Sequence, residues 1–222
     1  MSSTEHLDNV QAARPWDARA ARWLISPLAA SRITPNHLTT VRLAVGLAAA
    51  AAFLPGSYGW SNVAALLFVL SNFLDHTDGE LARLSGKSSR WGHLYDLASD
   101  AAVTVLTFVA MGIGVGVRSP GAFRVPPSYL GLAAGGAIAL VFYLRMRIEE
   151  RLGKSATAQA SLGGFETEDV LYLFPLVTLA DATATVLVAA SVCAPLFAAW
   201  VVVEYRRAMH GQVPMAARPS SG

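Results

Sequence analysis

Apolar residues occur along this chain in long uninterrupted runs, and short polar stretches separate them. Runs of this kind predict helices that cross a membrane, because a hydrocarbon layer about 30 Å thick is spanned by about 20 apolar residues. Six spans are expected, near residues 38–54, 60–81, 94–117, 129–146, 168–180 and 183–203. The fold class is therefore predicted to be an all-α integral membrane protein, whose short first and fifth spans take in flanking residues.

The residues before the first span follow a different pattern. Trp16, Trp23 and Leu28 recur at helical spacing among arginines, which predicts an amphipathic helix over 15–30 that lies at the membrane interface. A soluble helix leading into the membrane domain is the alternative. The polar segments 1–13 and 206–222 are expected to be disordered, so that the membrane domain covers 14–205.

The basic residues are distributed unevenly between the two predicted sides. Of the 17 Lys and Arg, all but Arg118 and Arg124 fall in the N-terminal segment, the loops after spans two and four, and the tail. The positive-inside rule then predicts that both termini are cytoplasmic and favours an even number of spans. Arginine far outnumbers lysine, as in proteins from GC-rich genomes, which favours a bacterial inner membrane. No basic surface interleaved with aromatic residues indicates a nucleic-acid partner.

Four aspartates interrupt the apolar pattern where the second span ends and the third begins. Asp75 and Asp78 lie on one face of a helix, and Asp96 and Asp100 lie on one face of the next. A tight turn around 85–89 folds these helices back, so the two faces are expected to meet. An ionised Asp within a membrane helix costs about 2.5–3.5 kcal/mol. Carboxylate oxygens suit magnesium, manganese or calcium, so a divalent cation is the expected compensation.

Small residues accompany the aspartates. Gly79 and Ala82 continue the face of Asp75 and would leave a groove in which a base or a phosphate can approach the helix. Gly92 would do the same on the facing helix, and Arg83 offers a fork of donors to a phosphate. Glu80 faces away from this stripe and is expected at the membrane interface.

This string resembles the signature of the CDP-alcohol phosphotransferase family (CDP-alcohol phosphatidyltransferase class I), D-x-x-D-G-x-x-A-R-x8-G-x3-D-x3-D. Every fixed position is filled, by Asp75, Asp78, Gly79, Ala82, Arg83, Gly92, Asp96 and Asp100. The six-span layout and the string Pro35-Asn36-x-x-Thr39-x-x-Arg42 at the start of the first span are similar to that family as well.

The resemblance implies a transferase of phospholipid biosynthesis. Such an enzyme moves a phosphatidyl or other substituted phosphate group from a CDP-linked donor to an alcohol hydroxyl and releases CMP. The resemblance implies that Asp75, Asp78, Asp96 and Asp100 hold two divalent cations, Mg²⁺ or Mn²⁺, with Asp96 and Asp100 catalytic and Asp100 the general base. Two cations about 3.5–4 Å apart stabilise both the attacking and the leaving oxygens of such a displacement.

The donor contacts are implied in the same way. Gly79 and Ala82, with Gly92 opposite, would admit the cytidine. The donor phosphates would be contacted by Arg83, Ser89, Asn36 and Thr39. A short six-span chain resembles the bacterial branch whose donor is CDP-diacylglycerol, and members of the family usually form homodimers through their membrane helices.

The acceptor is less defined. Arg145 and Arg147 resemble half of a pocket for a phosphorylated alcohol, but Glu166, Glu168 and Asp169 stand where the family would place arginine. A cationic or neutral alcohol, such as serine, ethanolamine, choline or a polyol, is therefore a candidate acceptor. The alternative is that these acids only line the cytoplasmic interface, and the acceptor is left unnamed. Two other functions stay open, a transporter that moves ions past the acidic site and a family member without catalysis.

Overall fold

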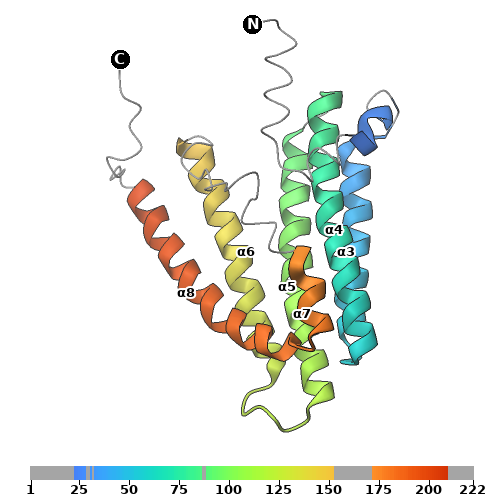
Figure 1. Cartoon of the computed structure of the whole chain (residues 1–222). Coiled ribbons are helices and arrows are strands. Elements are labelled where there is room, and N and C mark those ends of the chain that lie inside the picture. The colour runs from blue at the N-terminus through green and yellow to red at the C-terminus, as the bar shows by residue number, and fades with distance from the viewer. Residues whose placement is uncertain (1–22, 29–30, 32, 87–88, 153–171, 210–222) are drawn as a thin grey trace, which may run out of the picture.

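The computed structural model is a bundle of long helices (Figure 1). The structure describes residues 23–28, 31, 33–86, 89–152 and 172–209. A 3₁₀ turn, η1, covers Ser26–Leu28. The helices are α3 (Pro35–Phe53), α4 (Tyr58–Ser85), α5 (Arg90–Arg118), α6 (Pro127–Leu152), α7 (Phe174–Leu179) and α8 (Thr183–Met209). The regular structure of the described residues is entirely helical, as the sequence predicts.

Local sequence signals set the turn between α4 and α5. The C-cap of α4 is Gly86, which has a left-handed backbone (φ 65°) that glycine adopts without strain. Ser89 is the N-cap of α5, and its hydroxyl accepts a hydrogen bond from the Gly92 amide at 2.9 Å. The two helices therefore end and begin within a few residues of each other, at the same end of the bundle as the start of α3 (Figure 1).

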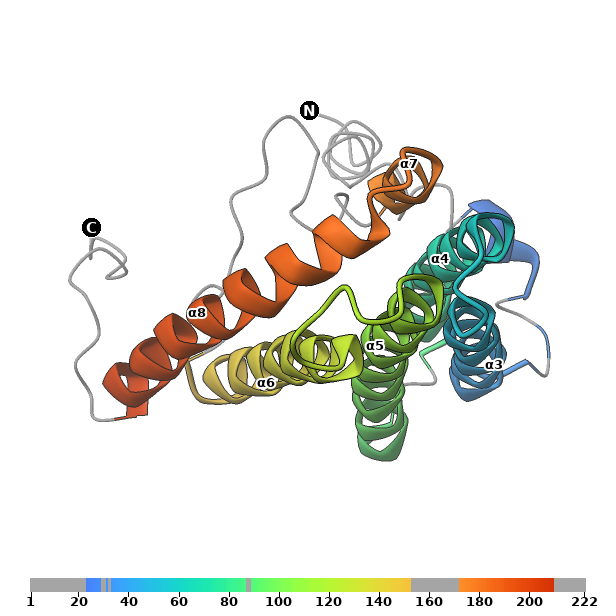
Figure 2. The same ribbon diagram turned by 90° about the horizontal axis from the view of Figure 1, so that it is seen from below.

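Helix α3 packs extensively against both α4 and α5 (Figure 2). Helices α4 and α5 make almost no direct backbone contact with each other. A glycine makes this close approach to two partners possible. A Cβ atom on Gly46 would lie 2.5 Å from a methyl group of Val103 in α5 and 2.9 Å from the hydroxyl of Ser71 in α4. The faces of α4 and α5 that carry the aspartates therefore both lie beside a third helix, α3. The short turn between α4 and α5 does not by itself predict that third partner.

Three helices in the described part of the chain are long and apolar enough to cross a membrane: Trp91–Arg118, Pro127–Ile148 and Thr183–Met209. They coincide with the spans predicted at 94–117, 129–146 and 183–203, although α8 continues to Met209. On the outer surface of α8, Val192, Leu196 and Trp200 are exposed, as expected of a helix in contact with lipid.

The other predicted spans are not confirmed. Helix α3 begins with a polar turn and is otherwise rich in alanine, and α4 carries the aspartates and several Ser and Asn side chains. Of the predicted span 168–180, residues 168–171 lie outside the described residues. The rest holds only the six-residue α7, about 9 Å long at 1.5 Å per residue. The amphipathic helix predicted over 15–30 lies mostly outside the described residues, and the segment 1–13 lies wholly outside them. Of the tail predicted to be disordered over 206–222, residues 206–209 are instead the end of helix α8, and 210–222 lie outside the described residues.

Glycines also bring α5 and α6 together. A Cβ atom on Gly131 of α6 would collide with the carbonyl oxygen of Phe108 in α5, whereas one on Gly136 of the same helix would meet nothing within 4 Å. Close approach of backbones through small residues is the usual way that helices associate in a membrane.

We therefore predict that Gly131→Ala destabilises the protein by about 1–3 kcal/mol, since the two helices must move apart. Gly136→Ala is the matched control and should be neutral or stabilising, because alanine favours a helix by about 1 kcal/mol over glycine. Thermal unfolding in one detergent compares the two variants. Equal melting temperatures would contradict the packing.

Candidate active site

Three of the predicted aspartates converge in the structure. Asp75 and Asp78 from α4 and Asp96 from α5 each offer one carboxylate oxygen, and these oxygens lie within 4.8 Å of one another. That spacing allows one cation to contact all three, and hard divalent ions prefer such oxygen ligands. The residues present therefore fit the divalent metal that the sequence predicts.

The arginine of α3 joins these carboxylates to the fourth aspartate. Arg42 Nη1 donates to Asp75 Oδ1 at 2.5 Å and to Asp100 Oδ1, and Nη2 donates to Asp96 Oδ1 at 2.9 Å. Only 3% of Arg42 is exposed, whereas about a third of each carboxylate side chain that it bonds is exposed: 31% for Asp75, 33% for Asp96 and 38% for Asp100. Solvent that reaches the carboxylates weakens these ion pairs, so their main effect is to orient the carboxylates around one buried cation. Arg42 is thus a structural centre of the cluster.

The guanidinium group is nearly saturated with acceptors. Its Nη2 also donates to the main-chain oxygen of Asp96 at 3.1 Å, so both terminal nitrogens donate twice. The remaining donor, Nε, is buried and has no partner among the described residues. An unpaired buried donor costs about 1–3 kcal/mol. Arg42 is therefore fixed in direction by four acceptors while one donor faces the interior unpaired.

Thr39, one helical turn before Arg42, holds the remaining aspartate. Its hydroxyl donates a hydrogen bond to Asp78 Oδ2 at 2.7 Å, and Thr39 as a whole is 2% exposed. Each of the four aspartates thus has one carboxylate oxygen engaged by a side chain of α3. Within the described residues, the second oxygen of each carboxylate has no hydrogen-bond donor, so it stays available to a ligand.

Sequence reasoning did not find the role of Arg42. The signal was present, because Asn36, Thr39 and Arg42 recur on one face at the start of α3. The pattern did not indicate that this face meets two other helices. Four carboxylates in an apolar chain also require positive charge to compensate them, and an arginine distant in sequence supplies part of it.

The predicted donor contacts are partly gathered in one place. Asn36 Oδ1 lies so close to Gly92 that a Cβ atom there would be 2.8 Å from it and 3.1 Å from Ser89 Oγ. These three residues therefore meet where α3 approaches the start of α5. On α4, a Cβ atom added to Gly79 would meet nothing within 4 Å, which leaves open space beside the aspartates. Ala82 lies on the same helix and is half-buried.

The expectation for Glu80 was wrong. Glu80 is 1% exposed and so lies inside the bundle, not at the interface. It forms an ion pair with Arg83, whose side chain is 67% exposed. A carboxylate buried this deeply requires a cationic partner, and Arg83 reaches it within one helical turn. Arg83 is thus held by Glu80 in the described structure.

The predicted acceptor residues are not brought together with the aspartates by any described contact. The Arg145 guanidinium lies over the ring of Phe197 in α8, 5.6 Å from its centroid. Arg147 is exposed on α6. Glu166 lies outside the described residues, with Glu168 and Asp169.

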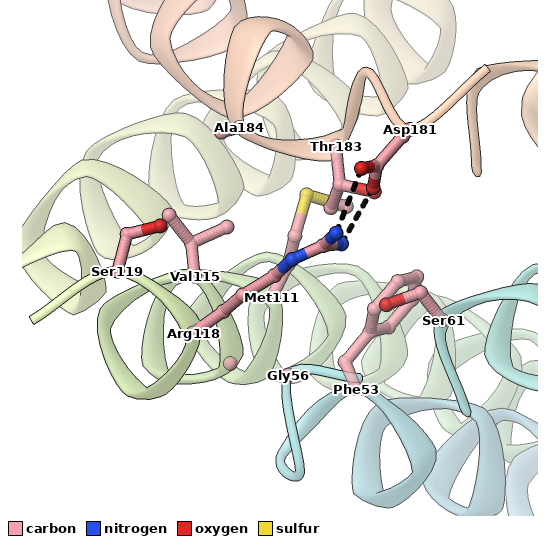
Figure 3. Close-up of a pocket in the computed structure, with 11 residues that line it drawn as sticks. Phe53, Gly56, Ser61, Met111, Val115, Arg118, Ser119, Asp181, Thr183 and Ala184 are labelled. Atoms are coloured by element: carbon pink, nitrogen blue, oxygen red, sulfur yellow. Dashed lines mark hydrogen bonds and ion pairs between the residues drawn. The ribbon is translucent and has the colours of Figure 1, made fainter. Parts of the chain in front are cut away.

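A separate cavity of about 190 Å³ lies where α3 ends and α8 begins, at the end of the bundle away from the aspartates. Figure 3 shows the residues that line it. Arg118 and Asp181 are its charged lining residues, and they pair with each other through two bonds of 2.5 and 2.7 Å. Phe53, Met111 and Val115 supply much of its apolar wall. Among the described lining residues Asp181 is the single carboxylate, and it is paired with Arg118, so this cavity lacks the cluster of carboxylates found beside Arg42.

Comparison with known proteins gives the same family as the motif. The model of the CDP-alcohol phosphatidyltransferase family matches residues 32–204. The chain is 31% identical to a "Bifunctional IPC transferase and DIPP synthase" from Rubrobacter xylanophilus over 147 residues, 66% of this chain and 30% of that protein. It is 30% identical to a "Cardiolipin synthase (CMP-forming)" from Streptomyces coelicolor over 151 residues, 68% of this chain and 64% of that protein.

A shorter match falls on a third relative. The chain is 38% identical over 76 residues to a "CDP-diacylglycerol–glycerol-3-phosphate 3-phosphatidyltransferase" from Cereibacter sphaeroides, which is 34% of each protein. The chain thus spans less than two thirds of the length of these relatives. Since the family model covers most of the chain, including α3 and every aspartate of the cluster, this chain belongs to the CDP-alcohol phosphatidyltransferase family.

Proposed function

We propose that this protein is a metal-dependent transferase that moves a phosphatidyl group from CDP-diacylglycerol to the hydroxyl of a small alcohol and releases CMP. The observation that carries the proposal is the convergence of Asp75, Asp78 and Asp96 from two helices on a space that one cation can share. The family assignment supports the reaction class. The names of two relatives contain "CMP-forming" and "CDP-diacylglycerol", which supports this donor.

The proposed cofactors are two divalent cations, Mg²⁺ or Mn²⁺, held by Asp75, Asp78, Asp96 and Asp100. When bound, such ions neutralise the charge that develops on the phosphate oxygens. The acceptor oxygen forms a bond to the phosphorus that carries the lipid, and the bond from that phosphorus to CMP breaks.

The proton of the acceptor hydroxyl goes to Asp100. The side chain of Asp100 is 38% exposed, so a hydroxyl can reach it, while Arg42 fixes one of its oxygens. A carboxylate beside cations is a weak base. It can still accept the proton of a hydroxyl whose oxygen is forming a bond to phosphorus, because the hydroxyl becomes more acidic as that bond forms. Asp96 belongs to the same catalytic group and shares Arg42 with Asp100.

The donor is proposed to lie between α3, α4 and α5. Gly79 and Ala82 would accept the cytidine, and Asn36, Ser89 and Gly92 would contact the phosphates together with Arg83. Thr39 would contribute from α3, where its hydroxyl donates a hydrogen bond to Asp78. The acyl chains would stay in the lipid bilayer.

The setting proposed for this reaction is a bacterial inner membrane. Three apolar helices and the family assignment mark an integral membrane protein. We propose six spans preceded by an interfacial helix, with both termini and the active site cytoplasmic, and a homodimer formed through membrane helices. The acceptor proposed is a cationic or neutral small alcohol, and Arg145, Arg147 and Glu166 are the residues proposed to surround it.

We expect Asp100→Asn to reduce CMP release by at least 100-fold, because the amide cannot take the proton of the acceptor. The measurement is CMP formation from CDP-diacylglycerol by purified protein in detergent with Mn²⁺, screened over small alcohols. Asp181→Asn, in the cavity at the other end of the bundle, is the control for a lost carboxylate. Ion flux across vesicles without any CMP release in the wild type would instead favour the transporter.

We expect Gly79→Leu to weaken binding of the CDP-linked donor by at least 10-fold, since the side chain would fill the open space beside the aspartates. Gly59→Leu is the matched control, because Gly59 is also on α4 and also has open space around it. Donor binding is measured by calorimetry with CDP-diacylglycerol in mixed micelles. Unchanged affinity in the Gly79 variant would disprove the groove.

A further inference from the structure

The contacts of Arg42 place a fixed positive charge inside the carboxylate cluster. Three of the four aspartates bond its guanidinium directly, and the fourth, Asp78, bonds Thr39 one turn earlier on the same helix. Arg42 is buried, and its direction is set by acceptors on α4 and α5 together. It cannot lose its proton in a protein, so its charge is permanent.

This charge changes the number of cations that the cluster can neutralise. Four ionised carboxylates and one guanidinium carry a net charge of minus three. One divalent cation leaves minus one, and a second would leave plus one beside the buried guanidinium of Arg42, where uncompensated positive charge is costly. The diphosphate of a CDP-linked donor brings two negative charges, which returns the loaded site to minus one.

Geometry supports the same limit. The three carboxylates that can share one ion are Asp75, Asp78 and Asp96, and Asp100 is outside that group. Nη1 of Arg42 contacts both Asp75 and Asp100, so the guanidinium already bridges the carboxylates that a second ion would use.

We propose that Arg42 acts as a built-in monovalent counter-ion, which limits the free protein to one divalent cation and makes the second depend on the diphosphate of the donor. This inference rests on the proposed function and deepens it. Arg42 is a positioning residue in this scheme. If Arg42 acts in this way, the second cation binds only when the nucleotide is bound, and the reactive state forms only then.

The test counts the Mn²⁺ ions that the purified full chain binds in detergent. Electron paramagnetic resonance measures the Mn²⁺ that stays free, and the bound number follows by difference. The nucleotide probe is CDP-glycerol, which carries the diphosphate without acyl chains, and a protein-free titration corrects for Mn²⁺ bound to it. The wild type should bind one ion alone and two with CDP-glycerol. Arg42→Gln should bind two without nucleotide, with at least a 10-fold gain in affinity for the second.

Two variants separate charge from geometry. Arg42→Lys keeps the charge but not the fork and should bind one ion without nucleotide. Thr39→Val removes the other α3 contact without changing charge and should do the same. If Arg42→Gln binds one ion like the wild type, or Arg42→Lys binds two, the counter-ion role is wrong.

The wild type alone also decides the matter if Arg42→Gln fails to fold, as gel filtration would show. Two ions bound without nucleotide would overturn the inference and leave the proposed transferase intact. No Mn²⁺ bound with or without CDP-glycerol would overturn the proposed metal-dependent function itself. One ion alone and two with CDP-glycerol would support both.

Discussion

Concentrated negative charge within an apolar bundle is the constraint on which this structure depends. Four carboxylates gather where α3, α4 and α5 meet, and each is bonded through one oxygen to a side chain of α3. Without compensation, such a cluster would push the helices apart or take up protons. Arg42 provides the compensation within the chain and at the same time orients the carboxylates. The opposing oxygens are left for external ligands, so one interaction serves both stability and chemistry.

The packing around this cluster relies on residues without side chains. Gly46 lets α3 approach α4 and α5 at once, and Gly131 lets α6 approach α5. Close backbones matter in a membrane, where lipid competes for apolar surface and packing is the main attraction between helices. The open space at Gly79 serves the opposite purpose, because there a missing side chain leaves room that no other described residue fills. Glycine thus closes the scaffold in some places and opens the site in another.

The two ends of the bundle treat charge differently. At one end, Arg118 and Asp181 pair through two bonds across a cavity with half-exposed side chains, and exposed pairs of this kind contribute little to stability. At the other end, one arginine is shared among three carboxylates, which leaves an excess of negative charge. That imbalance distinguishes a site that attracts cations from a contact that only joins helices. It is also consistent with the chemistry of the family to which the chain belongs.

The sequence by itself determined the helical class, three of the membrane helices, the four aspartates and the family, because each follows from spacing within one segment. Asp75 and Asp78 share a helix face whatever surrounds them, and a long apolar run spans a membrane in any fold. Only the tertiary structure decided that α3 lies against both helices of the motif, that Arg42 bridges Asp75, Asp96 and Asp100, and that Glu80 is buried. Arg42 lies more than thirty residues from its partners, and periodicity cannot show which face of one helix meets another. Those choices come from close packing at Gly46 and from the cost of burying unpaired charge, which act only once the helices are together.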